Sequence, residues 1–105
     1  MALAPVSSWF LPRTLEFARA GVKPGGLTRN REFFGPKVKA ASRIGEAVQD
    51  ALYDPQTSGG LLMAVPAKRV AALLAALKRR RVWTAVVGEA IARKPVTIEL
   101  EAGEK

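Results

Sequence analysis

Hydrophobic residues recur every three or four positions in three stretches of the chain, which is the spacing of an amphipathic helix. The three predicted helices are 11–20, 43–52 and 66–77. Gly21 suits the end of the first helix, and Pro66 suits the first turn of the third. Ser42 suits the cap of the second helix, in which Gly45 costs about 1 kcal/mol relative to Ala.

Other hydrophobic runs have the length and pattern of β-strands. Continuous apolar runs predict buried strands, and alternating apolar and polar residues predict a half-exposed one. The continuous runs are 61–65 and 82–87, and the alternating segment is 96–101. A short strand at 38–40 follows a brief helical turn, and Trp83 is expected in the core. This order of elements, with no internal repeat, predicts an α+β sandwich.

Two glycine-rich segments, 22–30 and 54–60, interrupt the pattern and are predicted to be loops. The first segment combines exposed backbone amides with a hydroxyl, a guanidinium and an amide, which together suit a phosphate. Its candidate contacts are Gly25, Gly26, Thr28, Arg29 and Asn30. The alternative is a tight turn without a ligand, and on spacing alone that alternative is favoured.

The second segment is predicted to have mainly a structural role. Its candidate residues are Asp54, Thr57, Ser58, Gly59 and Gly60. The three polar side chains can satisfy backbone groups of their own loop, and the glycines permit a tight entry into the following strand. Ligand contact is the less favoured alternative.

Composition limits the chemistry more than these motifs do. A length of 105 residues predicts a single domain, 1–105. The absence of Cys and His excludes a thiol nucleophile, a disulfide, an imidazole base and the usual zinc ligands. No long apolar run or signal peptide is visible, so we expect a cytoplasmic protein.

The net charge of +8 would attract phosphates, nucleic acid or acidic partners. Four consecutive cations follow the third predicted helix: Lys78, Arg79, Arg80 and Arg81. Cations stabilise the C-terminus of a helix, so a solvated helix end is favoured here over a nucleic-acid patch.

Two stretches of the chain carry a resemblance to a known family. They are Pro24-Gly25-Gly26-Leu27-Thr28-Arg29-Asn30-Arg31-Glu32-Phe33 and Asp54-Pro55-Gln56-Thr57-Ser58-Gly59-Gly60-Leu61-Leu62. Selenophosphate synthetases (selenide, water dikinases) have a Pro-Gly-Gly-Thr-x-Arg-Asn stretch after a helix. They also have an Asp-Pro-Gln-Thr-Ser-Gly-Gly-Leu-Leu stretch before an apolar strand. The sequence resembles this family over nearly its whole length.

The resemblance implies a C-terminal domain in which helices pack on an antiparallel sheet. That domain is similar to the one of aminoimidazole ribonucleotide synthetase and partly similar to the ferredoxin fold. The family converts ATP, selenide and water to selenophosphate, AMP and phosphate, with ATP and magnesium as cofactors. Its reactive Cys or selenocysteine, catalytic Lys and magnesium-binding aspartates belong to an N-terminal domain that this sequence lacks. We therefore expect a chain that is inactive alone and that helps another domain or a partner chain complete an ATP site.

Three departures from the family pattern have structural consequences. Leu27 stands where the family has Thr, with Thr28 one place later, which weakens the expected phosphate contact. The glycine expected after the long helix is replaced within 78–81. A left-handed residue with a side chain, or a different helix end, would then cost about 1 kcal/mol. Because little precedes the first predicted helix, the strand that usually begins this domain is expected to be missing or shortened to 3–6, and an open sheet edge there would favour self-association.

A second hypothesis from another class is a small basic module that binds RNA or DNA through the cations at 78–81. The sequence contains no recognised nucleic-acid motif and lacks the stacked aromatic residues that single-strand binders use. The family resemblance is therefore the leading hypothesis.

Overall fold

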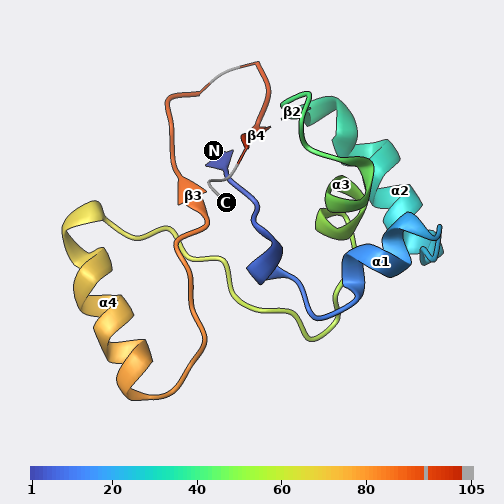
Figure 1. Ribbon diagram of the computed structural model, residues 1–105. Helices are drawn as coiled ribbons and strands as arrows, with labels where there is room; N and C mark the ends of the chain where they lie inside the picture. The colour runs from blue at the N-terminus through green and yellow to red at the C-terminus, as the bar shows by residue number, and fades with distance from the viewer. Residues whose placement is uncertain (94, 103–105) are drawn as a thin grey trace.

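The computed structural model describes residues 1–93 and 95–102 and contains a four-stranded β-sheet with helices packed against it. The strands are β1 (Ala2–Leu3), β2 (Val38–Ala40), β3 (Gly88–Glu89) and β4 (Ile98–Leu100). They lie in the order β2-β4-β1-β3, so the N-terminal strand lies between two strands from the end of the chain (Figure 1). The expected α+β class is confirmed, as are the short strands at 38–40 and within 96–101.

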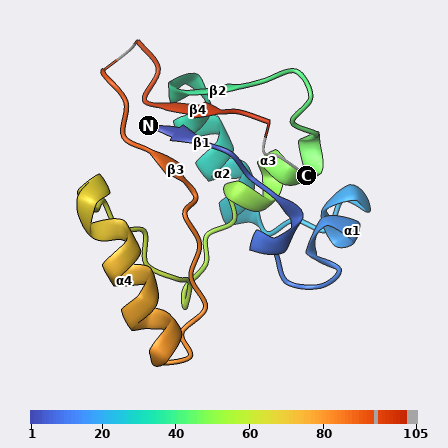
Figure 2. The same cartoon turned by 60° about the vertical axis from the view of Figure 1, so that its left-hand side comes forward.

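The sheet is mixed, so the expectation of an antiparallel sheet is only partly right. β1 runs antiparallel to β3, with Ala2 opposite Glu89. β4 runs parallel to both of its neighbours, β1 and β2, and Val38 lies opposite Ile98 (Figure 2). Parallel neighbours require long crossover connections, and here the helical segments between the strands provide them.

The helices are α1 (Thr14–Arg19), α2 (Gly25–Phe34), α3 (Glu46–Leu52) and α4 (Ala67–Arg79), with 3₁₀ turns at η1 (Ser7–Trp9) and η2 (Gly35–Lys37). The predicted helices 11–20 and 66–77 correspond to α1 and α4. α3 begins later than predicted because Gly45, in an extended conformation, is its cap in place of Ser42. Gly45 therefore avoids the helix interior, where glycine is unfavourable. No helix in the described part of the chain has the length and apolar character needed to cross a membrane.

The prediction of a loop at 22–30 is wrong, because helix α2 begins at Gly25. Pro24 is the extended residue that caps this helix, and its carbonyl accepts a hydrogen bond from the amide of Leu27 at 3.0 Å. Leu27 is 5% exposed, so its burial supports a helix that two glycines would otherwise disfavour.

The predictions of buried strands at 61–65 and 82–87 are also wrong. Neither segment is a strand in the described part of the chain. Of 82–87, only the last residue meets the sheet, where the Val87 carbonyl accepts a hydrogen bond from the Ala4 amide at 3.1 Å, and the ladder begins at Gly88. Leu61 is 89% exposed and Trp83 is 68% exposed, so Trp83 does not lie in the core. Strand-forming residues alone did not produce strands, because a ladder needs a neighbouring backbone as well.

The small hydrophobic core lies between the sheet and helices α2 and α3. Its buried residues are Ala2, Leu27, Ile44 and Leu100. They come from β1, α2, the turn before α3 and β4. This packing places α2 and α3 beside each other and leaves α4 apart from them (Figures 1 and 2).

Candidate functional site at the start of helix α2

The two glycine-rich motifs meet in space. A Cβ atom built on Gly26 would lie 2.8 Å from Cγ of Pro55, which is closer than carbon atoms pack. Gly26 is thus needed for the first turn of α2 to lie against the loop that follows α3. The structure therefore brings the start of the first motif and the start of the second together.

A hydrogen bond holds the same two segments together one turn further along α2. Nδ2 of Asn30 donates to the backbone carbonyl oxygen of Tyr53 at 3.0 Å, and this contact is partly buried. Tyr53 directly follows the last residue of α3. Asn30, a predicted phosphate contact, therefore links α2 to the end of α3.

A buried carboxylate anchors the chain on both sides of the glycine pair of the first motif. Asp50 of α3 is 2% exposed, and it forms ion pairs with Lys23, at 2.5 Å, and with Arg31. Lys23 immediately precedes Pro24, whereas Arg31 lies in the second turn of α2. Arg31 also forms an ion pair with Glu46 at 2.6 Å. One side chain of α3 thus sets the position of the segment that begins α2.

The charges of this cluster stabilise one another. Burial raises the pKa of Asp50, but hydrogen bonds from Lys23 and Arg31 more than compensate, so the pKa lies below its ordinary value. The hydrogen bond to Glu46 raises the pKa of Arg31; burial opposes this change and the bond to Asp50 adds to it. Both groups therefore remain charged at neutral pH.

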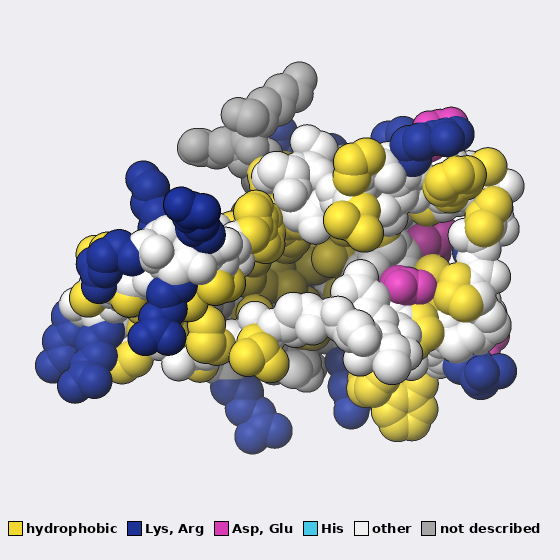
Figure 3. Space-filling view, turned by 90° about the horizontal axis from the view of Figure 1, so that it is seen from below, with side chains coloured by type: hydrophobic (Ala, Val, Ile, Leu, Met, Phe, Trp, Pro, Cys, Tyr) yellow, Lys and Arg dark blue, Asp and Glu magenta, His cyan; other side chains and the backbone are white. Residues whose placement is uncertain are grey.

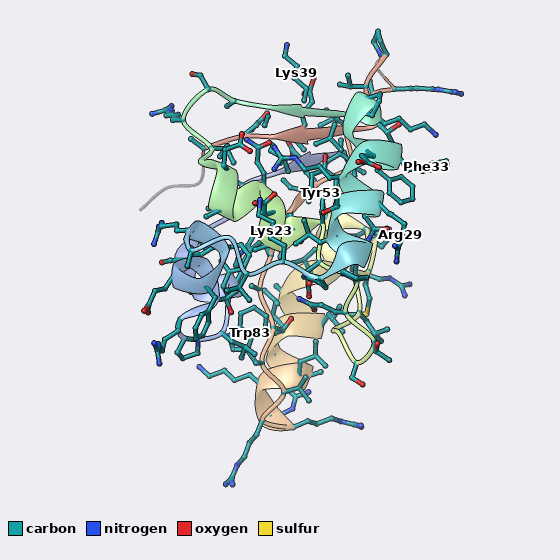
Figure 4. The ribbon with its side chains drawn as sticks, turned by 90° about the vertical axis from the view of Figure 1, so that its right-hand side faces the viewer. Lys23, Arg29, Phe33, Lys39, Tyr53 and Trp83 are labelled. Atoms are coloured by element: carbon teal, nitrogen blue, oxygen red, sulfur yellow. The ribbon has the colours of Figure 1, made fainter. Side chains whose placement is uncertain are left out.

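The backbone amides at the start of α2 form the anion-attracting part of the site. Those of Gly25 and Gly26 precede the first helical hydrogen bond and carry the positive end of the helix dipole. Gly25 is exposed, as are Thr28 and Arg29. Arg29 and Phe33 extend from the outer side of α2, away from α3 (Figure 4).

A cavity of about 320 Å³ lies beside this helix start, but its charges do not favour an anion. It is lined by Lys23, Leu27, Thr28, Arg31, Glu32 and Asp50. Two cations face two carboxylates, so the charges cancel. An anionic ligand would therefore approach the outer side of the helix start, where Arg29 lies.

The second predicted site, 54–60, is an exposed loop without regular structure, as expected. The side chains of Asp54, Thr57 and Ser58 form no hydrogen bond within the described residues, so the expected bonds to the backbone of their own loop are not made. Backbone bonds such as that from the Gln56 amide to the Asp54 carbonyl, at 2.9 Å, shape the turn instead. A Cβ on Gly59 would lie 2.9 Å from Oε1 of Gln56, and Gly60 borders open space.

Sequence reasoning missed the ion-pair cluster of Lys23, Arg31 and Asp50. Arg31 lies inside the first motif, but nothing in the sequence indicated that its partner is Asp50, 19 residues later. The one local signal was Asp50 itself, three residues after Ala47 and so next to the apolar face of its helix.

The described residues offer no group of three or more His, Cys, Asp or Glu side chains able to hold a metal ion.

The fold and the site define an α+β domain in which a glycine-initiated helix packs against an Asp-Pro loop. Comparison with known proteins agrees with the family resemblance. The chain is 44% identical over 81 residues to a selenide, water dikinase of Pelobacter propionicus, which covers 76% of this chain and 23% of that protein. It is 41% identical over 78 residues to one of Myxococcus xanthus, covering 74% and 22%, respectively. No family model and no solved structure matches the chain.

The chain is therefore a homologue of one segment of the selenide, water dikinases, and the resemblance predicted from the two motifs is confirmed. It spans about a quarter of the length of these curated relatives, which fits a C-terminal domain. These relatives do not favour the nucleic-acid-binding hypothesis.

Proposed function

We propose that the chain is the C-terminal domain of a protein that performs the selenide, water dikinase reaction. In this reaction ATP, selenide and water yield selenophosphate, AMP and phosphate. The observation that supports the proposal is 44% identity to such a protein over 76% of this chain. Because the match covers 23% of that relative, the catalytic part lies outside this sequence, on the same chain or on a partner.

Within this proposal, the start of α2 contributes to the phosphate site. The free amides of Gly25 and Gly26 attract an anion, as helix N-termini do, and the exposed guanidinium of Arg29 adds a cation. Thr28, which is exposed in the first turn of α2, supplies a hydroxyl. Asn30 and the loop at 54–60 have a supporting role, since both hold the start of α2 against the end of α3.

The isolated chain is proposed to have no turnover. Phosphoryl transfer requires phosphates held by metal ions and a positioned nucleophile. The sequence has no Cys and no His, and the described residues include no cluster of carboxylates for a metal. The domain therefore completes a site that is mainly built elsewhere.

A chimaera tests this function directly. In the Pelobacter propionicus selenide, water dikinase, the matched segment is replaced by this chain, and AMP release from MgATP is measured with and without selenide. We expect selenide-dependent AMP release by the chimaera and none by the isolated chain.

The matched variant is the chimaera with Arg29→Ala, which removes an exposed cation without disturbing the core. It should raise the KM for ATP several-fold while melting at the same temperature. A folded chimaera without selenide-dependent AMP release would refute the proposed function, and an unchanged KM would refute the role of Arg29.

A further inference from the structure

Residues 61–86, here called the arm, stand apart from the rest of the molecule. The arm consists of α4 and the two extended segments on either side of it (Figures 1 and 2). Its exposed large hydrophobic residues are Leu61, Leu62, Met63, Val82, Trp83 and Val86, with exposed fractions from 49% to 89%. None of the residues of α4 is buried. The arm therefore has a hydrophobic surface that its own chain leaves uncovered.

The size of the molecule leads to the same conclusion. Its accessible surface is 8423 Å², whereas a compact monomer of 11.3 kDa exposes about 5,700 Å². The Cα radius of gyration is 14.7 Å, against about 12.9 Å for a compact domain of this length. The surplus of roughly 2,700 Å² is as large as the share that one partner contributes to an extensive protein interface.

The backbone of the arm is uncovered as well. Within the described residues, no hydrogen bond involves the backbone of 61–65 or 83–86. Both segments have the composition of strands, and the second leads directly into β3, at the edge of the sheet. An edge of this kind is a template for pairing with another backbone.

The arm is strongly basic, and this limits the kind of partner. It contains six cations and no carboxylate: Lys68, Arg69, Lys78, Arg79, Arg80 and Arg81. Figure 3 shows basic side chains around the hydrophobic ones at the end of the molecule that projects furthest, next to a recess lined with hydrophobic side chains. Two copies of this surface would repel each other. A lipid surface would leave the strand backbone unpaired in its apolar part.

We infer that the arm is the docking surface for the part of the protein outside this sequence. The partner surface is a protein surface with an apolar centre, an acidic rim and a backbone edge that pairs with 61–65 or 83–86. This inference rests on the proposed function, since the relatives supply a further three quarters of their length to occupy the surface. Docking would bury the arm residues and extend the sheet beyond β3.

Hydrogen exchange in the chimaera described above tests the inference. We expect the amides of 61–65 and 83–86 to exchange at least tenfold more slowly in the chimaera than in the isolated chain, with α2 and α3 changing little. Equal exchange of the arm in both proteins would overturn the inference, whether the arm is open in both or protected in both.

Substitutions locate the contact. In the chimaera, Leu62→Asp and Trp83→Asp should each return arm exchange towards the rate of the isolated chain. Leu11→Asp is the matched control, because Leu11 is 80% exposed and lies outside the arm. Should the apolar variants fail to fold, Lys78→Glu with Arg79→Glu tests the acidic rim at an exposed helix end. Unchanged arm protection in that double variant would overturn the inference.

Two further outcomes would overturn it by assigning the surface to another occupant. One is a dimer of the isolated chain in sedimentation, with the arm protected in the dimer. The other is binding of the isolated chain to vesicles of phosphatidylserine and phosphatidylcholine through the arm.

The chimaera also distinguishes failure of the proposed function from failure of the docking inference. An inactive chimaera with a protected arm refutes the reaction alone. An active chimaera with an open arm refutes the docking alone.

Discussion

Asp50 illustrates how a single residue can position a whole segment. It is the one charged side chain found buried in the described part of the molecule, and both its carboxylate oxygens bind cations. A buried carboxylate without partners would be costly, but Lys23 and Arg31 compensate for its lost hydration. Because these two cations precede and follow the glycine pair, the stability of the cluster and the position of the candidate site are linked.

Replacing Asp50 with Asn should lower the free energy of unfolding by about 1 to 3 kcal/mol, since two cations lose their anion. Because the folded-state pKa of Asp50 is lowered, its contribution is complete above about pH 4, the ordinary pKa of Asp. It is lost as the pH falls through the folded-state value. Urea unfolding at several pH values should therefore show a smaller acid loss in Asp50→Asn.

The control for this prediction is Glu46→Gln, which removes the other carboxylate that binds Arg31. Its side chain is 74% exposed, so we expect a change within about 0.5 kcal/mol. Equal losses in the two variants would contradict the special role of the buried carboxylate.

Gly26→Ala should destabilise the domain by about 1 to 3 kcal/mol, because its new methyl group would overlap Pro55. Gly25→Ala is the matched control, since the nearest atom to its methyl is Nη1 of Arg29 at an ordinary 3.7 Å. In this control the better helix propensity of Ala should make the change neutral or stabilising.

The double variant Gly26→Ala with Pro55→Ala should recover much of the stability that Gly26→Ala loses, as measured by thermal unfolding. No recovery would exclude the overlap with Pro55 as the cause of the loss.

At the scale of elements, α4 shows how a helix can end without its usual glycine. The amide of Val82 donates to the carbonyl of Leu77 at 3.0 Å, which is the hydrogen bond of a Schellman end. The left-handed position is held by Arg81, with φ of 57°. Of the two outcomes predicted from the missing glycine, the left-handed side chain is therefore the one adopted.

Arg81→Gly should stabilise the chain by up to about 1 kcal/mol, because glycine adopts positive φ without steric cost. Arg80, with φ of −87°, is the adjacent control. Arg80→Gly should be neutral or destabilising, since it gains nothing there and only raises the entropy of the unfolded chain. Urea midpoints in the opposite order would contradict this account of the helix end.

At the scale of the whole molecule, the chain divides into a packed part and an open arm. The packed part holds the core, the ion-pair cluster and the start of α2, whereas the arm carries six of the 17 cations. The packed part is thus held by long-range contacts, but the arm is held mainly by the local hydrogen bonds of α4. Local opening should therefore be easiest in the arm.

Limited digestion with trypsin should cut the isolated chain first after the cations at 78–81, and later after Arg31. The former are exposed at a helix end, but Arg31 is held by Asp50 and Glu46 in a packed helix. Mass spectrometry of early fragments measures the order of cleavage. An early cut after Arg31 would mean that α2 opens as readily as the arm.

Much of the fold was visible in the sequence where local pattern decides the outcome. The helical periodicity before Gly21 and after Pro66 predicted α1 and α4. The motif at 54–60 indicated a shaped loop, and the two motifs together indicated the family that the comparisons support. These features depend on neighbouring residues and on residue types, so one chain is enough to identify them.

The remaining features were decided by contacts between distant residues. Glycines that indicate a turn in isolation begin a helix here, because Gly26 lies against Pro55 and Leu27 enters the core. The partner of Arg31 is 19 residues away, and the direction of β4 depends on its crossovers. The run 61–65 has the composition of a strand but no backbone beside it. The sequence therefore determined local conformation and the family resemblance. Tertiary packing decided strand pairing, burial and the surface left open to a partner, because these depend on which distant groups meet.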